Sequence, residues 1–450
     1  MAKLDNLIIL INNYLWGIPM LLLLLGLHIF LTFRLRFIQR YIWKAIKLSF
    51  SKSDDSLGDI SHFGALSTAL AATIGTGNII GVATAVAHGG PGAIFWLWLT
   101  GVFGIATKYS EALLAIKYRQ KTSDGTFLGG PMIVLEKGLR QKWLGVCFAL
   151  FTCLAAFGIG NMVQANSISN MMKDTFNVSP FICGVILSLL TAMVILGGIK
   201  SIAKFCIAFV PFMSIFYIIS CIVIISLNYE YIIPAIILII KSAFTVKAAS
   251  FGFVASTMIS AARYGISRGL FSNEAGLGSA PIVAAAAKTK NPVSQALVSS
   301  TGTFWDTVII CALTGLTIVT SGIKEPNMIK GLSGPFISNA IFSQISFVGQ
   351  FLLSISLFTF VFSTIIGWSY YGERALEYLV GKKAIMPYRV LWVFAILFGS
   401  IASLPFVWNF ADAMNALMAL PNIISLIMLN KIIVSETKKY LWEKRIDLTH

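Results

Sequence analysis

The sequence has little charge for its length. Of its 450 residues only 12% are Asp, Glu, Lys or Arg, while 57% are hydrophobic. Ordinary soluble domains carry about 25% charged residues. The composition therefore excludes a large aqueous domain, a fibrous protein and a disordered chain. Because about 20 apolar residues cross a bilayer, it predicts a polytopic membrane protein.

Histidine and cysteine are also scarce. The four histidines, at 28, 62, 88 and 450, are scattered, and the six cysteines lie in or beside apolar runs without forming a CxxC pair. Disulfide, structural-zinc and metalloenzyme patterns are therefore lacking. An enzyme embedded in the membrane needs paired acids, a Cys–His pair or a metal set. We expect no enzyme activity and no cofactor.

Acidic residues are outnumbered, 18 against 34 basic ones, which gives a net charge of +16. Such a charge can indicate nucleic-acid binding. Here the Lys and Arg residues cluster in short loops between apolar runs, where the positive-inside rule places them. The charge therefore predicts membrane orientation, and no nucleic-acid partner is expected.

Eleven apolar runs are long enough to span a bilayer. They lie at roughly 14–33, 63–88, 91–117, 143–173, 180–198, 202–227, 248–287, 294–320, 346–370, 388–404 and 408–430. The first is too long for a signal peptide and has its basic residues after it rather than before it, so we interpret it as a span. The basic loops predict an N-terminus outside the cell and a C-terminal tail, 431–450, in the cytoplasm. We therefore expect a multi-pass protein of the plasma or inner membrane.

The stretch 228–247 is ambiguous. Its apolar core, IIPAIILII, is short for a span, so we interpret it as an interfacial or outer-loop helix. If it crossed the membrane, every later orientation would invert.

One span is interrupted by glycine. Residues 71–78 read AATIGTGN in the middle of an apolar run. In lipid, broken backbone survives only against protein or a cavity. A broken helix leaves N–H groups suited to a carboxylate and carbonyls suited to Na⁺. The alternative is a small-residue packing face.

A second interruption begins the later series of spans. Residues 263–280 read RYGISRGLFSNEAGLGSA, and the break lies either at 263–269 or at 271–278. Matching interruptions in two halves are typical of transporters with inverted repeats. We therefore expect one domain with an extra helix at 14–33, a first five-helix repeat at 63–227 and a second at 248–430. Part of 263–280 could instead be an inner loop.

Polar residues in other spans are further candidates. Ser363 and Thr364 offer hydroxyl oxygens to a hard cation, or bond to their own helix. Trp368 follows one turn later and suits a pocket wall or an interfacial belt. Three amide side chains in the run 143–173 can either line a cavity or join helices; they are Asn161, Gln164 and Asn166. Six ionisable residues inside spans are candidates for function or for helix packing; they are Glu111, Arg263, Arg268, Glu274, Asp306 and Asp412.

Two long stretches resemble the sodium:alanine (alanine or glycine:cation) symporter family. They are GTGNIIGVATAVAHGGPGAIFWLWLTGVFGIATKYSEALLA (75–115) and RYGISRGLFSNEAGLGSAPIVAAAA (263–287). The resemblance runs from about residue 14 to 430. It implies an all-α LeuT-type fold, with ten core helices in two inverted repeats plus one helix. It also implies Na⁺-driven uptake of alanine or glycine, with glutamine in some members.

The same resemblance implies a site. The substrate carboxylate would meet the backbone N–H groups of Thr76 and Gly77, with Asn78 beside them. The pocket walls would be Gln164, Phe271, Asn273 and Trp368. The Na⁺ ligands would be the carbonyls of Ala71 and Ile74 and the hydroxyls of Ser363 and Thr364.

Other functions remain as alternatives. A proton-coupled carrier, or one selective for serine or glutamine, would share the fold. A channel would need polar residues along a continuous pore, whereas here they gather at two mid-span breaks. The expected partners are therefore a small neutral amino acid, co-transported Na⁺ and the lipid bilayer.

Overall fold

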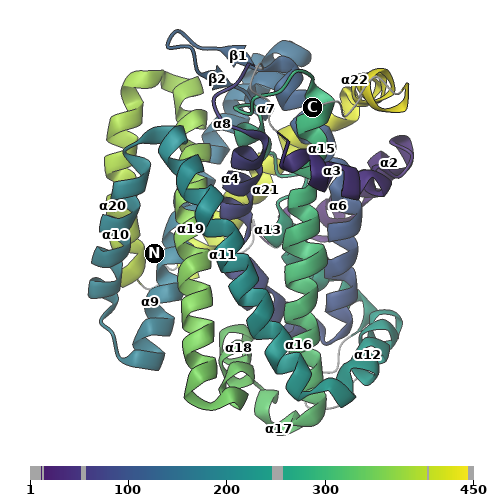
Figure 1. The fold of residues 1–450 in the computed structure, drawn as a ribbon, viewed down its shortest axis with the longest axis vertical. Coiled ribbons are helices and arrows are strands. Elements are labelled where there is room, and N and C mark those ends of the chain that lie inside the picture. The colour runs from purple at the N-terminus through teal and green to yellow at the C-terminus, as the bar shows by residue number, and fades with distance from the viewer. Residues whose placement is uncertain (1–11, 13–14, 52–56, 246–256, 403–404, 444–450) are drawn as a thin grey trace.

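The computed structural model describes the chain except residues 1–11, 13–14, 52–56, 246–256, 403–404 and 444–450, and the side chains of 405–407. The beginning of the predicted run 248–287 and the end of the tail 431–450 lie outside the described residues. The described part is almost entirely helical, and its 35-residue helix α19 runs along the longest axis (Figure 1).

The helices follow the apolar runs of the sequence. In chain order they are α2 (Ile18–Arg34), α3 (Ile42–Ser49), α4 (His62–Thr73), α5 (Val82–Gly89), α6 (Gly92–Tyr118), α7 (Pro131–Ile133), α8 (Lys142–Phe157), α9 (Val163–Phe176), α10 (Pro180–Ile195), α11 (Gly198–Leu227), α12 (Ile232–Phe244), α13 (Met258–Asn273), α14 (Pro281–Ala284), α15 (Pro292–Thr303), α16 (Ala312–Lys324), α17 (Pro326–Ile329), α18 (Gly334–Phe342), α19 (Ser346–Val380), α20 (Ile385–Ile401), α21 (Pro405–Met428) and α22 (Asn430–Thr437).

Each of the eleven predicted runs contains helix. Among the described residues, six helices are long and apolar enough to cross a membrane, or up to eight when two bent pairs are each taken as one span. The remaining runs correspond to α6, to α10 and to the broken pair α13–α14. The stretch 228–247 forms the 13-residue helix α12, which is too short to cross.

One short β-hairpin marks an end of the molecule. Its strands, β1 (Gln120–Lys121) and β2 (Phe127–Leu128), pair antiparallel after α6. Helices α12, α17 and α18 lie at the opposite end (Figure 1). We call these the hairpin end and the α12 end.

Helix α13 packs against α6 through glycine. A Cβ on Gly265 would lie 2.3 Å from the carbonyl oxygen of Ala93, and one on Gly269 would lie 2.2 Å from Thr100 Oγ1. Small residues let helix backbones approach closely within a membrane. Residues 263–269 are therefore continuous helix and a packing face. The first of the two predicted positions for the break is wrong, and the break follows α13.

Candidate functional site

The first predicted break is real. Helix α4 ends at Thr73, and the chain resumes as a π-helical turn, Gly77–Gly81, that leads into α5. The two pieces are bent by 53°. Ile74 has extended backbone angles, φ −76° and ψ 98°, which end the helical hydrogen bonding. Free main-chain groups are therefore present at mid-span, as the sequence predicted.

Neutral side-chain oxygens face the free N–H groups of this break. The N–H of Gly75 donates to Asn78 Oδ1 over 2.9 Å, and the N–H of Thr76 donates to Gln164 Oε1 over 3.4 Å. The Thr76 hydroxyl is buried and has no hydrogen-bond partner among the described residues. Amide oxygens carry only partial charge, and the contact to Thr76 is long. An incoming carboxylate would therefore be a stronger acceptor.

The carbonyl side of the break meets α19. Thr364 Oγ1 lies 3.2 Å from the carbonyl oxygen of Ile74 and 2.9 Å from that of Phe360. A Cβ on Gly75 would lie 2.5 Å from the same hydroxyl, so only glycine permits this approach. Two predicted cation ligands from distant parts of the chain, Ile74 and Thr364, are thus brought together.

The other two predicted cation ligands, Ser363 and Ala71, form no hydrogen bond between the first break and α19 in the described part of the chain. Ser363 Oγ donates to the carbonyl of Phe360 in its own helix, which was the alternative considered from the sequence. Ala71 is fully buried near the end of α4. Its neighbour Ala72 is so close to α19 that its nitrogen would lie 2.7 Å from a Cβ on Gly367.

Trp368 is held in one orientation. A Cβ on Gly160 would lie 2.3 Å from Trp368 Cβ, so the tryptophan packs directly on that glycine. Its indole N–H donates to Glu274 Oε1 over 3.0 Å. With Gln164 donating to the carbonyl of Ile159 over 3.0 Å, two predicted pocket walls are fixed by the same π-helical stretch, 158–162.

Phe271 lies on the other side of the first break. Its Cδ1 is 3.2 Å from the Cβ position of Gly77, and its ring stacks on Trp408 at 6.4 Å. A cavity of about 370 Å³ opens toward the α12 end and is lined by Trp408, Arg268 and Asn166. Ile79 and Ile80 of the π-helical turn also line this cavity, so it reaches the first break directly.

The second break follows Asn273. Glu274, Gly276 and Gly278 have φ values of 55°, 89° and 86°, and the chain returns to helix at α14. The N–H groups of both glycines donate to Glu111 Oε1, over 3.0 and 3.1 Å. Asn422 donates to the same oxygen over 2.6 Å and to the carbonyl of Gly276 over 2.9 Å. The Glu111 side chain thus accepts hydrogen bonds from the free main-chain N–H groups of the second break.

Asn273 belongs to this second break. Its Oδ1 accepts from the N–H of Ala275, and its carbonyl accepts from Lys108 Nζ over 2.8 Å. Within the described part of the chain, its hydrogen bonds go to Ala275, Lys108 and Thr100 and do not reach the first break. Its role as a substrate ligand stays a prediction, and the structure shows a cap and an anchor to α6.

Asp306 joins the two breaks. Its Oδ1 accepts from Asn78 Nδ2 over 2.7 Å, and its Oδ2 accepts from the hydroxyls of Ser272 and Thr307 over 2.9 and 2.6 Å. The sequence marked this aspartate as an ionisable residue inside a span but did not reveal its partners. Its side-chain hydrogen-bond partners are an amide and two hydroxyls.

Sequence reasoning missed how the other buried ionisable residues are arranged. Glu111 and Lys108 of α6 form hydrogen bonds with the second break, which contains Glu274, although α6 and α13 are far apart in the sequence. The only signal was the presence of charge inside apolar runs. By contrast, Asn161 and Asn166 donate to main-chain carbonyls of Trp392, Gly399 and Ala402, which is helix packing.

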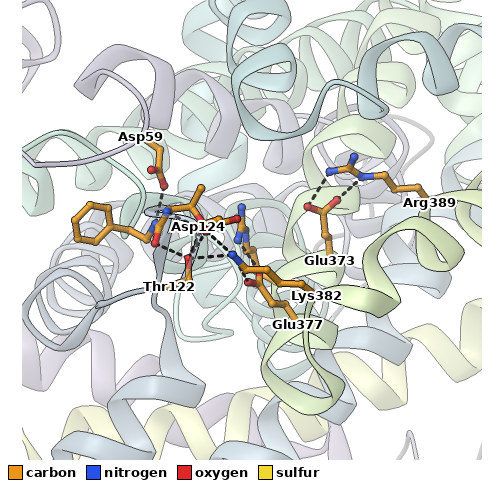
Figure 2. Close-up of polar contacts among 10 residues, drawn as sticks. Asp59, Thr122, Asp124, Glu373, Glu377, Lys382 and Arg389 are labelled. Carbon is orange, nitrogen blue, oxygen red and sulfur yellow. Dashed lines mark hydrogen bonds and ion pairs between the residues drawn. The ribbon is translucent and has the colours of Figure 1, made fainter.

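The hairpin end is closed by polar ties. Figure 2 shows Thr122 and Asp124 of the hairpin directed at Lys382, which forms an ion pair with Asp124. Asp59, just before α4, accepts from the N–H of Phe127 over 2.9 Å. Nearby, Glu373 forms two hydrogen bonds with Arg389. Lys382 and the Thr122 hydroxyl hold the pKa of Asp124 well below its usual range.

Main-chain pairing closes the same end. Ile60 forms a parallel bridge with Ala287, and the N–H of Lys288 donates to the carbonyl of Ile60 over 2.7 Å. The segment that leads into the first broken helix is therefore paired with the segment that leaves the second.

Comparisons of the sequence with known proteins identify its family. The model of the sodium:alanine symporter family matches residues 1–449. A relative from Methanococcus maripaludis, named sodium/alanine symporter AgcS, is 53% identical and covers 96% of each chain. A Bacillus subtilis relative, named probable sodium/glutamine symporter GlnT, is 36% identical, and the match covers 98% of this chain and 92% of that one. Another Bacillus subtilis relative, named putative sodium/proton-dependent alanine carrier protein YrbD, is 36% identical, and the match covers 97% of this chain and 92% of that one.

Solved structures confirm the fold. The structure of MhsT in complex with L-phenylalanine matches with a TM-score of 0.56 at 14% identity, covering 84% of this chain and 89% of that one. A manganese transporter mutant from Eremococcus coleocola matches with a TM-score of 0.51 at 14% identity, covering 83% and 78%. The predicted all-α LeuT-type fold is confirmed.

Proposed function

The chain belongs to the sodium:alanine symporter family, and we propose that it carries alanine or glycine into the cell together with Na⁺. It is a multi-pass membrane transporter rather than an enzyme. The assignment of each site residue below is part of the proposal.

One contact carries the proposal. Thr364 Oγ1 lies 3.2 Å from the carbonyl of Ile74, at the end of a helix that is broken at mid-span. Hydroxyl and carbonyl oxygens are the ligands that hard cations prefer. We assign the Na⁺ site to the carbonyls of Ala71 and Ile74 with Ser363 and Thr364, where an ion would join α4 to α19.

The substrate carboxylate would replace neutral oxygens at the first break. It would meet the N–H groups of Thr76 and Gly77, in place of Gln164 Oε1, with Asn78 holding the turn from the side. Charge-assisted hydrogen bonds are roughly twice as strong as neutral ones, which supports this exchange. Asn273 would complete the pocket from the second break.

The pocket favours a small side chain. Phe271 lies directly against Gly77, and Trp368 is fixed between Gly160 and Glu274. Neither ring can move without breaking these contacts. This supports alanine and glycine over glutamine, which the name of the GlnT relative would suggest.

Transport follows by alternating access. We assign 63–227 and 248–430 to two inverted five-helix repeats, with the N-terminal helix outside them, the N-terminus outside the cell and the C-terminus in the cytoplasm. Opening toward the cytoplasm would separate Ile60 from Ala287 and Asp59 from Phe127. The Na⁺ gradient and the membrane potential, about 2.3 kcal/mol per charge per 100 mV, would drive the cycle.

The double variant Ser363→Ala, Thr364→Ala tests the cation site. Because both hydroxyls are lost, we expect the Na⁺ concentration for half-maximal alanine uptake to rise at least tenfold, an effect of about 1.4 kcal/mol. Labelled alanine uptake into proteoliposomes, titrated with Na⁺ at constant ionic strength, measures it. Unchanged sodium dependence would refute the cation site, and undiminished uptake in choline would favour proton coupling instead.

A further inference from the structure

A basic cavity lies at the hairpin end, separate from the substrate site. Its volume is about 310 Å³, and it lies where the end of α6, the loop 288–292 and α22 with its following turn meet. Four cationic side chains and one carboxylate line it: Lys117, Arg119, Lys290, Lys439 and Glu436. Three parts of the chain that are far apart in sequence thus contribute positive charge to one hollow.

The charges in the cavity do not balance. The single carboxylate, on Glu436, is taken by Lys117 at 2.5 Å. The guanidinium of Arg119 donates to main-chain carbonyls, including those of Ala285 and Ala287. Lys290 and Lys439 form no ion pair within the described ranges of the chain. The cavity therefore has an excess of positive charge with room for an anion.

The positive-inside rule does not account for this arrangement. That rule explains why lysines occur in cytoplasmic loops, but it does not require them to converge on one cavity. Glu436 is held in position by a fixed helix, because Tyr109 and Thr437 form a hydrogen bond of 2.8 Å between α6 and α22. The cation-lined wall is thus a built surface rather than a free tail.

Neighbouring aromatic residues place the cavity at the depth of lipid headgroups. Trp43 in helix α3 and Phe50, the residue that follows this helix, are 71% and 69% exposed. Helix α3 packs against α15, whose first residue, Pro292, lines the cavity. Exposed aromatic side chains mark the membrane–water interface, and α3 and α22 lie at one edge of the hairpin end (Figure 1).

We propose that this cavity binds the phosphate group of an anionic phospholipid, with Lys290 and Lys439 as its direct ligands. Basic pockets between helices on the cytoplasmic side suit such headgroups. The lipid would tie the loop that follows the second break to the C-terminal helix. The proposal depends on the membrane orientation but not on which amino acid is carried.

The test compares two double variants of the full-length protein in nanodiscs. One is Lys290→Gln, Lys439→Gln. The matched control is Lys173→Gln, Lys330→Gln, which removes the same charge from exposed residues at the α12 end. Nanodiscs contain phosphatidylcholine alone, phosphatidylcholine with phosphatidylglycerol, or phosphatidylcholine with inorganic phosphate in the buffer. Thermal unfolding and retained phospholipid, measured by native mass spectrometry, are the readouts.

We expect phosphatidylglycerol to raise the unfolding temperature of the wild type and of the control. In the cavity variant, phosphatidylglycerol binding should weaken roughly thirtyfold, since each lysine near an anionic surface contributes about 1 kcal/mol and 1.4 kcal/mol is tenfold. The same pattern with inorganic phosphate would identify the cavity as a site for free phosphate and overturn the lipid. Equal responses of both variants, or no response of the wild type, would overturn the site altogether.

Discussion

The two broken helices differ in what faces their free N–H groups. At the first break the acceptors are neutral amide oxygens of Asn78 and Gln164. At the second break the acceptor is a carboxylate of the protein, Glu111. At the second break one carboxyl oxygen of the protein accepts three hydrogen bonds, while the first break is left with weaker acceptors that an external anion can displace. The same local chemistry therefore serves structure at one break and binding at the other.

Removing Glu111 is expected to have the largest effect, because it takes away the acceptor that distinguishes the second break from the first. In Glu111→Ala two buried N–H groups and the Asn422 amide lose their shared acceptor. Each unsatisfied group costs about 1–3 kcal/mol, so we expect a loss of about 3 kcal/mol or more in stability, and no transport. Thermal unfolding and uptake measure it. Glu111→Gln keeps one oxygen and should lose less; equal loss in the two variants would contradict the capping role.

Changing Gln164 would sharpen the comparison at the first break. We expect Gln164→Ala to strengthen alanine binding by up to about tenfold, because the substrate carboxylate no longer has to displace Gln164 Oε1 from the N–H of Thr76. The unfolding temperature should fall only slightly, because the variant loses one long contact and one neutral hydrogen bond, to the carbonyl of Ile159. Equilibrium binding and thermal unfolding of the same preparation separate the two effects. A large loss of stability with normal binding would show that Gln164 is a structural cap like Glu111.

The two hydroxyls of α19 should differ as well. Thr364 reaches across to Ile74, whereas Ser363 bonds within its own helix. We expect Thr364→Ala alone to account for most of the rise in Na⁺ requirement and Ser363→Ala for a few-fold rise. Sodium titrations of uptake by the single variants decide this. A larger effect from Ser363→Ala would mean that its hydroxyl turns toward the ion.

An exposed carboxylate gives the smallest expected effect. Lys382 lowers the pKa of Asp124, so this ion pair stabilises the fold above the ordinary carboxyl pKa and is lost as pH falls through the lowered value. Asp124 is 51% exposed, so water screens the pair. We expect Asp124→Asn to cost at most about 0.5 kcal/mol at pH 7, with the difference from wild type vanishing in acid. Thermal unfolding against pH measures it.

Much of the fold was predictable because lipid imposes simple rules. Apolar runs of helix length predicted the helices, and glycine next to polar residues in the middle of a span predicted the break at 71–78. The position of the second break was not predictable, since Gly265 and Gly269 look like helix breakers in sequence. Their role as a packing face depends on Ala93 and Thr100 of α6, which no local pattern reveals.

The sequence by itself determined that this protein lies in a lipid bilayer, where its helices are and where its first core helix breaks. These features follow from hydrophobicity and backbone freedom, which are properties of local segments. Only the tertiary structure decided which partner each buried polar group meets. Glu111, Asp306 and Thr364 acquire their roles from helices that are distant in the chain, and burial in a medium without water makes those pairings obligatory.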